Sequence, residues 1–277
     1  MLQGYIERFA GIGRLYGAAA LRRLHDSHVA VVGVGGVGSW TVEALARTGV
    51  GALTLVDMDD VCISNTNRQL QALKDAGGRP KVEVLRQRVL GINPDCRVCA
   101  IQRYYTPATS PALLAPPAPG SRPYDAVADA MDSVRDKCHL LAECRRLGIP
   151  VATSGGCAGK RAPDRVRVTD LAQTGADNLL RHVRRILRHD YGFPASPASF
   201  GIPAVCSSEI SSPAPCDGAC DISLPSQAGS LLTPELHGRA LHPNCEWGYG
   251  TAVFVSGTFG FHLAAAVVSL LLSLETA

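Results

Sequence analysis

Short apolar runs and amphipathic segments alternate along the first 170 residues of the chain. The runs have the length and the Val, Ile, Leu and Ala content of buried parallel strands. They cover residues 28–32, 52–56, 97–101, 126–128, 150–153 and 165–169. Apolar residues at helical spacing fall between several of them, in residues 15–26, 37–49, 81–92 and 134–148. This alternation predicts an α/β fold with a doubly wound, mostly parallel, Rossmann-like sheet, whose ligands bind beyond the carboxyl ends of the strands.

Three segments depart from this alternation. Residues 106–123 contain six prolines and are expected to form a surface loop. Residues 191–244 are rich in Pro, Ser, Gly and Cys without periodicity, which is typical of a functional crossover segment or lid. Residues 247–274 carry no formal charge, yet four glycines interrupt them. For them we expect a strand followed by an apolar helix, buried or at a dimer interface, rather than a membrane span; a peripheral membrane contact stays open.

Composition narrows the class of protein. A chain of 277 residues with 46% hydrophobic and 18% charged residues is neither disordered nor fibrous. Its 27 basic residues exceed its 24 acidic ones by only three, so a case for nucleic-acid binding must come from local patches. The start of the chain shows no signal-peptide pattern, so we expect its ten cysteines to be reduced and the protein to be cytoplasmic.

A glycine motif marks a nucleotide site. Gly33, Gly35 and Gly38 form G-x-G-x-x-G between an apolar strand and a helix, and Asp57 ends the next strand. Glycines let the backbone turn sharply and approach phosphates at the helix N-terminus, while Asp57 can accept hydrogen bonds from ribose hydroxyls. The motif alone does not separate NAD(P) or FAD from ATP.

Three charged residues favour ATP chemistry. Cleavage of a triphosphate needs cations where charge develops and a carboxylate to hold Mg²⁺. Arg68, Lys81 and Asp132 supply this set close to the ends of the predicted strands. Taken singly, Arg68 and Lys81 could be solvent-exposed charges and Asp132 could cap the next helix. An NAD(P)-dependent oxidoreductase therefore remains an alternative.

The order of these motifs resembles that of a known family. The segments GVGGVGSW, LTLVDMDDV, SNTNRQ, PKVEVLRQRVLGINP and DAMDSVRDK are similar to the adenylating domain of the ThiF/MoeB and ubiquitin-activating superfamily over residues 8–170. The nucleotide-binding residues that the resemblance implies are Gly33, Gly35, Gly36, Gly38, Asp57, Asp59, Asn65, Asn67, Arg68, Gln69 and Lys81. It also implies catalysis by Lys81 and Asp132, with Asp132 on Mg²⁺. Arg14 would reach as an arginine finger into the site of a partner, which implies a homodimer.

Within this superfamily the chain resembles the tRNA threonylcarbamoyladenosine dehydratases over nearly its whole length. The segments RLYG, VDMDDVCISNTNRQ, VTDLAQT and SGTFGF carry this resemblance. It implies a ligase-type enzyme that uses ATP to adenylate the carboxylate of N6-threonylcarbamoyladenosine at position 37 of tRNA. The carbamoyl group then closes a ring, with loss of AMP and net loss of water. We expect one adenylating domain over residues 1–277, with a nucleotide-binding core in 1–170 and a tRNA-facing crossover and C-terminal helix in 171–277.

An alternative function for the chain is to adenylate the C-terminus of a ubiquitin-like sulfur-carrier protein, and the cysteines bear on this alternative. Activators of such carriers commonly hold zinc with two C-x-x-C pairs, which this chain lacks, so we expect no structural zinc. Cys245 is the candidate for a catalytic or sulfur-relay thiol, and a structural cysteine is the alternative. A cysteine desulfurase or sulfur-acceptor system is a possible partner by resemblance alone.

A basic segment provides the candidate tRNA surface. Arg181, Arg184, Arg185 and Arg188 lie within eight positions of a predicted helix. Such a cluster can bind a phosphate backbone with strong salt dependence, although a solvated helix face is the simpler alternative.

Overall fold

A computed structural model describes residues 3–115, 123–212 and 249–273 of the chain. Its centre is a seven-stranded sheet in the order β3-β2-β1-β4-β5-β7-β6. The strands are β1 (His28–Val32), β2 (Ala52–Val56), β3 (Arg97–Ile101), β4 (Ala126–Asp129), β5 (Val151–Ser154), β6 (Val166–Asp170) and β7 (Pro203–Ser207). All neighbours are parallel except β6 and β7. The chain leaves β1 to build one half of the sheet and returns beside β1 with β4, which confirms the doubly wound fold.

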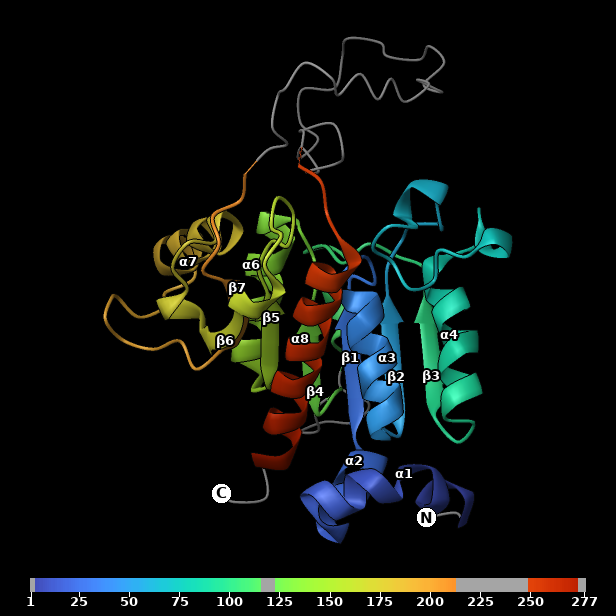
Figure 1. Cartoon of the computed structure of the whole chain (residues 1–277). Coiled ribbons are helices and arrows are strands. Elements are labelled where there is room, and N and C mark those ends of the chain that lie inside the picture. Colours follow the sequence, from blue (N-terminus) through green and yellow to red (C-terminus); the bar gives the residue numbers. More distant parts are fainter. Residues whose placement is uncertain (1–2, 116–122, 213–248, 274–277) are drawn as a thin grey trace.

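Helices cover both faces of the sheet (Figure 1). Alternation along β1 shows how the two layers are separated: Val29 and Val31 pack into one core cluster, and Ala30 and Val32 pack into the other. The first cluster lies under α3 (Gly38–Thr48), α4 (Lys81–Ile92) and α8 (Val253–Ser273). The second lies under α5 (Ser110–Leu113), α6 (Val134–Leu147) and α7 (Asn178–Asp190). Helices α1 (Gln3–Tyr16) and α2 (Ala18–Asp26) lie at the amino ends of the strands (Figure 1).

The C-terminal apolar helix α8 is largely a core element. By length and composition alone it could cross a membrane, but 61% of its most apolar window is buried within the protein. It lies against α3, where a Cβ added to Gly260 would be only 2.6 Å from the Cβ of Trp40 and from the carbonyl oxygen of Val37. The hydroxyl of Thr41 also donates a hydrogen bond of 3.1 Å to the carbonyl oxygen of Gly260. A glycine is therefore needed where the two helices meet. No strand precedes α8 in residues 249–252, so that part of the expectation is wrong.

Some other boundaries also differ from the expectations. The helix expected over 15–26 is divided, because Gly17 has φ of +95° and separates α1 from α2. The strand expected at 165–169 is present as β6, but it runs antiparallel to β7 at the edge of the sheet and is only partly buried. Strand β3 is the other edge and is also partly exposed. Strand β7 lies inside the segment 191–244 that showed no periodicity, because five residues are too few to reveal one.

Candidate nucleotide site and basic surface

The glycine loop turns from β1 into α3, as the motif predicts. Gly33 has φ of +84°, and a Cβ there would lie 3.0 Å from the backbone of Ala130. A Cβ on Gly38 would lie 1.9 Å from the carbonyl oxygen of Gly33. The loop's own geometry therefore requires these two glycines. A Cβ on Gly35 or Gly36 would meet nothing closer than 3.5 Å, which is ordinary van der Waals contact, so the folded chain itself does not require a glycine at either position.

Asp57 anchors this loop from the end of β2. Its Oδ2 accepts a hydrogen bond of 2.7 Å from the backbone N–H of Val34, and its Oδ1 accepts one of 2.9 Å from that of Asp59. Burial raises the pKa of Asp57 above its ordinary value, and the nearby Lys81 and these two N–H groups partly oppose that rise. A residue expected only as a ribose ligand thus also fixes the backbone of the glycine loop.

The segment after β2 brings Arg68 and Gln69 to the glycine loop. A Cβ added to Gly36 would lie 3.5 Å from the Arg68 side chain, and one added to Gly35 would lie 3.8 Å from Nε2 of Gln69. The Arg68 guanidinium donates to the carbonyl oxygen of Ser64 at 2.9 Å and to Oδ1 of Asn67 at 2.8 Å. Arg68 is half-buried and is not a freely solvated charge.

Asn65 and Asn67 shape the same segment. Asn65 is buried, and its Oδ1 accepts a hydrogen bond of 3.1 Å from the backbone N–H of Cys62. The Nδ2 of Asn67 donates one of 2.8 Å to the carbonyl oxygen of Thr251, just before α8. Both asparagines therefore hold backbone in this structure, and Asn67 ties the segment to the C-terminal part of the chain.

Lys81 is directed inward from the first turn of α4. Its side chain is only 6% exposed, and its Nζ lies 2.8 Å from Oδ2 of Asp59, whose own side chain is 52% exposed. The alternative of a solvent-exposed helix charge is therefore wrong for Lys81. A buried ammonium with one carboxylate partner is suited to receiving an anion, because it retains two further N–H donors.

Asp132 follows β4 beside the glycine loop. The alternative role as a helix cap belongs instead to Ser133, whose Oγ accepts a hydrogen bond from the backbone N–H of Asp136. Asp132 is exposed and has no hydrogen bond or ion pair with another residue of the described ranges. Its free, hard oxygen donors are the type that Mg²⁺ prefers. Within the described part of the chain, no group of three or more His, Cys, Asp or Glu side chains could hold a metal. A Mg²⁺ ion bound to Asp132 would therefore take most of its other ligands from phosphate oxygens and water.

One cluster at this edge escaped the sequence analysis. Lys137 in α6 is fully buried and pairs with Asp129 at the end of β4, beside Thr153 of β5. The only signal in the sequence was a lysine on the apolar side of an amphipathic helix.

Arg14 does not approach the nucleotide site of its own chain. It is exposed in the last turn of α1, and α1 lies at the amino ends of the strands, opposite the glycine loop (Figure 1). The candidate thiol Cys245 lies outside the described residues, as do Cys216 and Cys220. The seven cysteines that the structure describes are all free.

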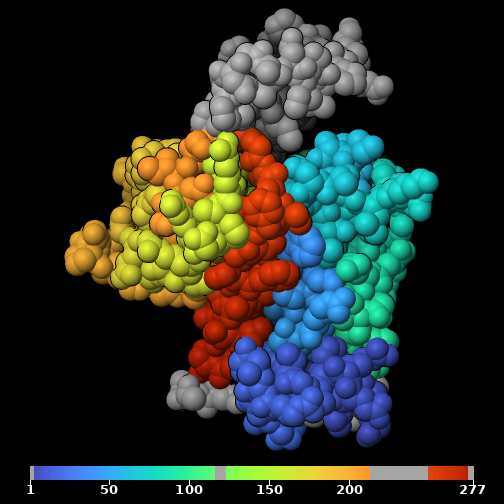
Figure 2. Space-filling view, viewed as in Figure 1, coloured from blue at the N-terminus to red at the C-terminus, as the bar shows by residue number. Residues whose placement is uncertain are grey.

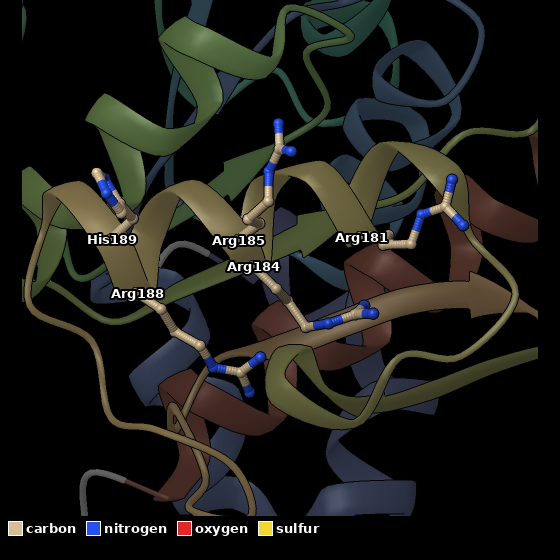
Figure 3. Close-up of a pocket in the computed structure, with 5 residues that line it drawn as sticks. All are labelled: Arg181, Arg184, Arg185, Arg188 and His189. Atoms are coloured by element: carbon tan, nitrogen blue, oxygen red, sulfur yellow. The ribbon is translucent and has the colours of Figure 1, made fainter.

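The predicted basic helix forms as α7. Asp177 caps it by accepting a hydrogen bond of 3.0 Å from the N–H of Leu180, and its apolar face packs into the second core cluster beside α6. The side chains that line a pocket on the opposite face are Arg181, Arg184, Arg185, Arg188 and His189 (Figure 3).

The four arginines of this pocket differ in how they are held. Arg188 donates from Nε to the carbonyl oxygen of Pro194 at 3.2 Å and lies over the Phe200 ring at 5.1 Å. Arg184 donates to the hydroxyl of Thr174. Arg181 and Arg185 are exposed and have no such partner in the described ranges. The structure thus separates two anchored arginines from two that are free to bind an anion.

Comparison with known proteins identifies the family. Residues 9–173 match the ThiF family, which is more than half of the chain. The chain belongs to the ThiF family. The matched residues run from α1 to just beyond β6, and so include the glycine loop, Lys81 and Asp132.

Similarity to individual relatives extends further than the family match. This ThiF-family chain is 41% identical to the tRNA threonylcarbamoyladenosine dehydratase of Haemophilus influenzae, over 98% of its own length and 95% of the relative's. It is also similar to crystal structures of E. coli tRNA N6-threonylcarbamoyladenosine dehydratase, TcdA, in complex with ATP and with AMP. For both, the TM-score is 0.80 and the identity 39%, over 99% of this chain and 98% of the other. These comparisons do not favour a sulfur-carrier activator or an NAD(P)-dependent oxidoreductase.

Proposed function

We propose that the chain is an ATP-dependent dehydratase of N6-threonylcarbamoyladenosine at position 37 of tRNA. The observation that carries this proposal is the similarity to dehydratases of that name over nearly the full length of both chains. A shared nucleotide-binding core alone would fit many adenylating enzymes. Here the similarity also includes the crossover region and α8, which lie outside the ThiF family match.

The residues of the site suit carboxylate activation. The glycine loop and the N-terminus of α3 would receive the phosphates of ATP, and Asp57 would bind the ribose. Attack of the substrate carboxylate on the α-phosphorus forms an acyl adenylate and releases pyrophosphate. Arg68 and Lys81 would stabilise the negative charge that develops on the phosphates.

Ring closure follows from activation of the carboxylate. A carboxylate is a poor electrophile, and adenylation gives it AMP as a good leaving group. The carbamoyl group of the same nucleoside then attacks the activated carbonyl, which expels AMP and closes the ring. Because both groups belong to one molecule, the entropic part of the barrier is small. The net change in the nucleoside is the loss of one water molecule.

Mg²⁺ is the proposed metal, with Asp132 as its protein ligand. The support is a carboxylate that no described residue engages, at the strand end beside the glycine loop. A bound Mg²⁺ would neutralise charge on the phosphates of ATP.

A homodimer is the proposed assembly. Arg14 lies at the far end of its own sheet, so it could act only in the site of a second copy. Helix α8 leaves part of its surface uncovered (Figure 2), including Phe254 at 56% exposure and Phe261 at 50%. Large exposed aromatic side chains on an uncharged helix are typical of a protein interface.

The proposed tRNA surface is the pocket face of α7. Arg181 and Arg185 are free to bind phosphates, and their neighbours Arg184 and Arg188 add positive charge. With tRNA and ATP as substrates, we place the enzyme in the cytoplasm. A desulfurase or sulfur-acceptor partner stays a prediction that rests on family resemblance.

The test is mass spectrometry of nucleosides from tRNA that contains threonylcarbamoyladenosine, after incubation with the protein, ATP and Mg²⁺. We expect the modified nucleoside to lose the mass of one water, only when ATP is present. Lys81→Ala should abolish the reaction, and Lys74→Ala, which removes an exposed positive charge, is the matched control. Full activity of Lys81→Ala would refute the assigned role of that residue. An unchanged nucleoside with a protein that still binds ATP would refute the proposed function.

A further inference from the structure

A buried ion pair lies at the end of β4, three residues before the proposed metal ligand Asp132. Lys137 and Asp129 have fully buried side chains, and Nζ of Lys137 lies 2.7 Å from Oδ2 of Asp129. The lysine also donates to Oγ1 of Thr153 at 3.1 Å and to the carbonyl oxygen of Ser154 at 3.0 Å. All three protons of the ammonium group are therefore used.

Asp129 is as fully engaged as the lysine. Its Oδ2 also accepts a hydrogen bond of 2.7 Å from the hydroxyl of Thr153. Its other oxygen, Oδ1, accepts one of 3.1 Å from the backbone N–H of Met131. The cluster of Asp129, Lys137 and Thr153 thus joins β4, β5 and the first turn of α6 at the carboxyl edge of the sheet.

The bond to Met131 connects the cluster to the nucleotide site. The backbone of Ala130 and Met131 lies against Gly33, so closely that a Cβ there would be 3.0 Å from Ala130 and 3.1 Å from the nitrogen of Met131. The next residue is Asp132. The glycine loop has its own anchor in the hydrogen bond from the Val34 N–H to Asp57, so the bond to Met131 mainly sets the point from which the Asp132 carboxylate extends.

Joining strands does not by itself require a buried cluster of charged and polar side chains. Removing two charges from water is expensive, and well-packed apolar side chains of similar volume often stabilise a core as well or better. A network of hydrogen bonds with fixed donors and acceptors, in contrast, permits one backbone orientation.

We propose that Asp129, Lys137 and Thr153 are positioning residues that hold the Met131–Asp132 backbone in the orientation in which Asp132 engages the metal of bound Mg²⁺–ATP. This inference rests on the proposed function, because it takes Asp132 as the metal ligand. It predicts a selective effect: weakening the cluster impairs binding of the metal–triphosphate and spares binding of AMP, which needs the glycine loop and Asp57 but no metal.

Thr153→Val is the perturbation of choice, because it keeps the volume and removes only the hydroxyl. Lys137 then loses one acceptor and Asp129 one donor, while their ion pair remains. Calorimetric titration of the full chain should show Mg²⁺–ATP binding weakened about five-fold, the loss expected for one hydrogen bond, with AMP binding unchanged. Thr153→Ser restores the hydroxyl and should recover the wild-type affinity for Mg²⁺–ATP. Asp132→Asn provides the reference for complete loss of the Mg²⁺ contribution.

The outcomes separate this inference from the proposed function. Equal weakening of Mg²⁺–ATP and AMP by Thr153→Val would mean a general structural role and would overturn the inference. Unchanged binding of both ligands by a folded Thr153→Val would overturn it as well. If Mg²⁺ does not strengthen ATP binding by the wild-type protein, or if Asp132→Asn leaves that strengthening intact, the assignment of Asp132 fails and the inference falls with it.

Discussion

Replacing Gly33 with alanine tests whether the glycine loop is specified by its own backbone or by the nucleotide. Gly33 has φ of +84°, and an added Cβ would lie 3.0 Å from the carbonyl carbon and oxygen of Ala130. Both features exist without a ligand. We therefore expect Gly33→Ala to destabilise the protein even in the absence of ATP.

The magnitude follows from three contributions. A left-handed backbone costs an L-residue about 1–2 kcal/mol, and forcing a methyl group into a packed site costs about 1–3 kcal/mol. The smaller entropy of the unfolded alanine chain returns about 0.5–1 kcal/mol. The net loss in the free energy of unfolding is about 1–4.5 kcal/mol, which corresponds to a Tm lower by about 2–8 °C for a chain of 277 residues.

Gly36→Ala is the matched control, three residues further along the same loop. Its Cβ would meet only side-chain atoms of Arg68 and Ser256, at 3.5 Å or more, and its φ is not positive. Thermal unfolding without nucleotide should therefore give a Tm within about 1 °C of wild type. If the phosphates of ATP lie against this loop, the rise in Tm that ATP causes in the wild type should be lost in Gly36→Ala.

Two results would refute this reasoning. A wild-type Tm for Gly33→Ala without nucleotide would show that the loop accommodates a side chain at that position. A wild-type response of Gly36→Ala to ATP would show that the phosphates do not bind against Gly36.

Three further predictions concern stability and tRNA binding. Glu43→Gln should lower the free energy of unfolding by about 1–2 kcal/mol. Burial opposes ionisation of Glu43, but hydrogen bonds from Arg88 and Arg47 outweigh burial and hold the pKa of Glu43 below 4.5. Since the pKa of Glu43 is lower in the native state than in the unfolded state, this stability is present above pH 4.5 and is lost as pH falls through the native pKa. The free energies of unfolding of the two proteins, measured by urea denaturation, should therefore become equal in acid. A difference that stays constant with pH would contradict the assignment. Gly260→Ala should lower Tm, because the added methyl group separates α8 from α3. Gly91→Ala is the control and should not lower Tm, since its Cβ would have nothing within 4 Å. Equal Tm values for the two variants would contradict the close approach of α8 to α3 at Gly260. Replacing Arg181 and Arg185 with serine should weaken tRNA binding and reduce the slope of log affinity against log salt by about 2, and an unchanged slope would exclude α7 as a phosphate-binding face.

Local patterns account for most of the sheet and for the position of the nucleotide site. Strands β1, β2 and β3 coincide with the apolar runs at 28–32, 52–56 and 97–101, because short runs rich in β-branched residues are a local property. Helix α4 begins at Lys81, directly after Pro80, as expected for proline at a helix start. The glycine motif requires only a few neighbouring residues to form its turn, so it too is visible in sequence.

Contacts between distant segments decided the rest. The direction of β6 depends on its pairing with β7, which is more than thirty residues away and has too few residues to show a period. The burial of Lys81 depends on Asp59, which lies 22 residues earlier in the chain. The role of Asp132 is an exception that was decided locally: Ser133 accepts the capping hydrogen bond from the N–H of Asp136, which residue types alone do not show, and the Asp132 carboxylate is left free of it.

The chain's sequence by itself therefore determined the class of fold, the order of its main elements and the strand end at which nucleotide chemistry is expected. It did so because helix and strand periods, turns and the glycine motif depend on residues close together in the chain. The tertiary structure alone decided that Asp129, Lys137 and Thr153 meet beside the backbone of Met131, because the three elements that carry them pack together only in the folded chain. Residue type reveals that a buried charge needs a partner, but only the packed fold shows which partner it has.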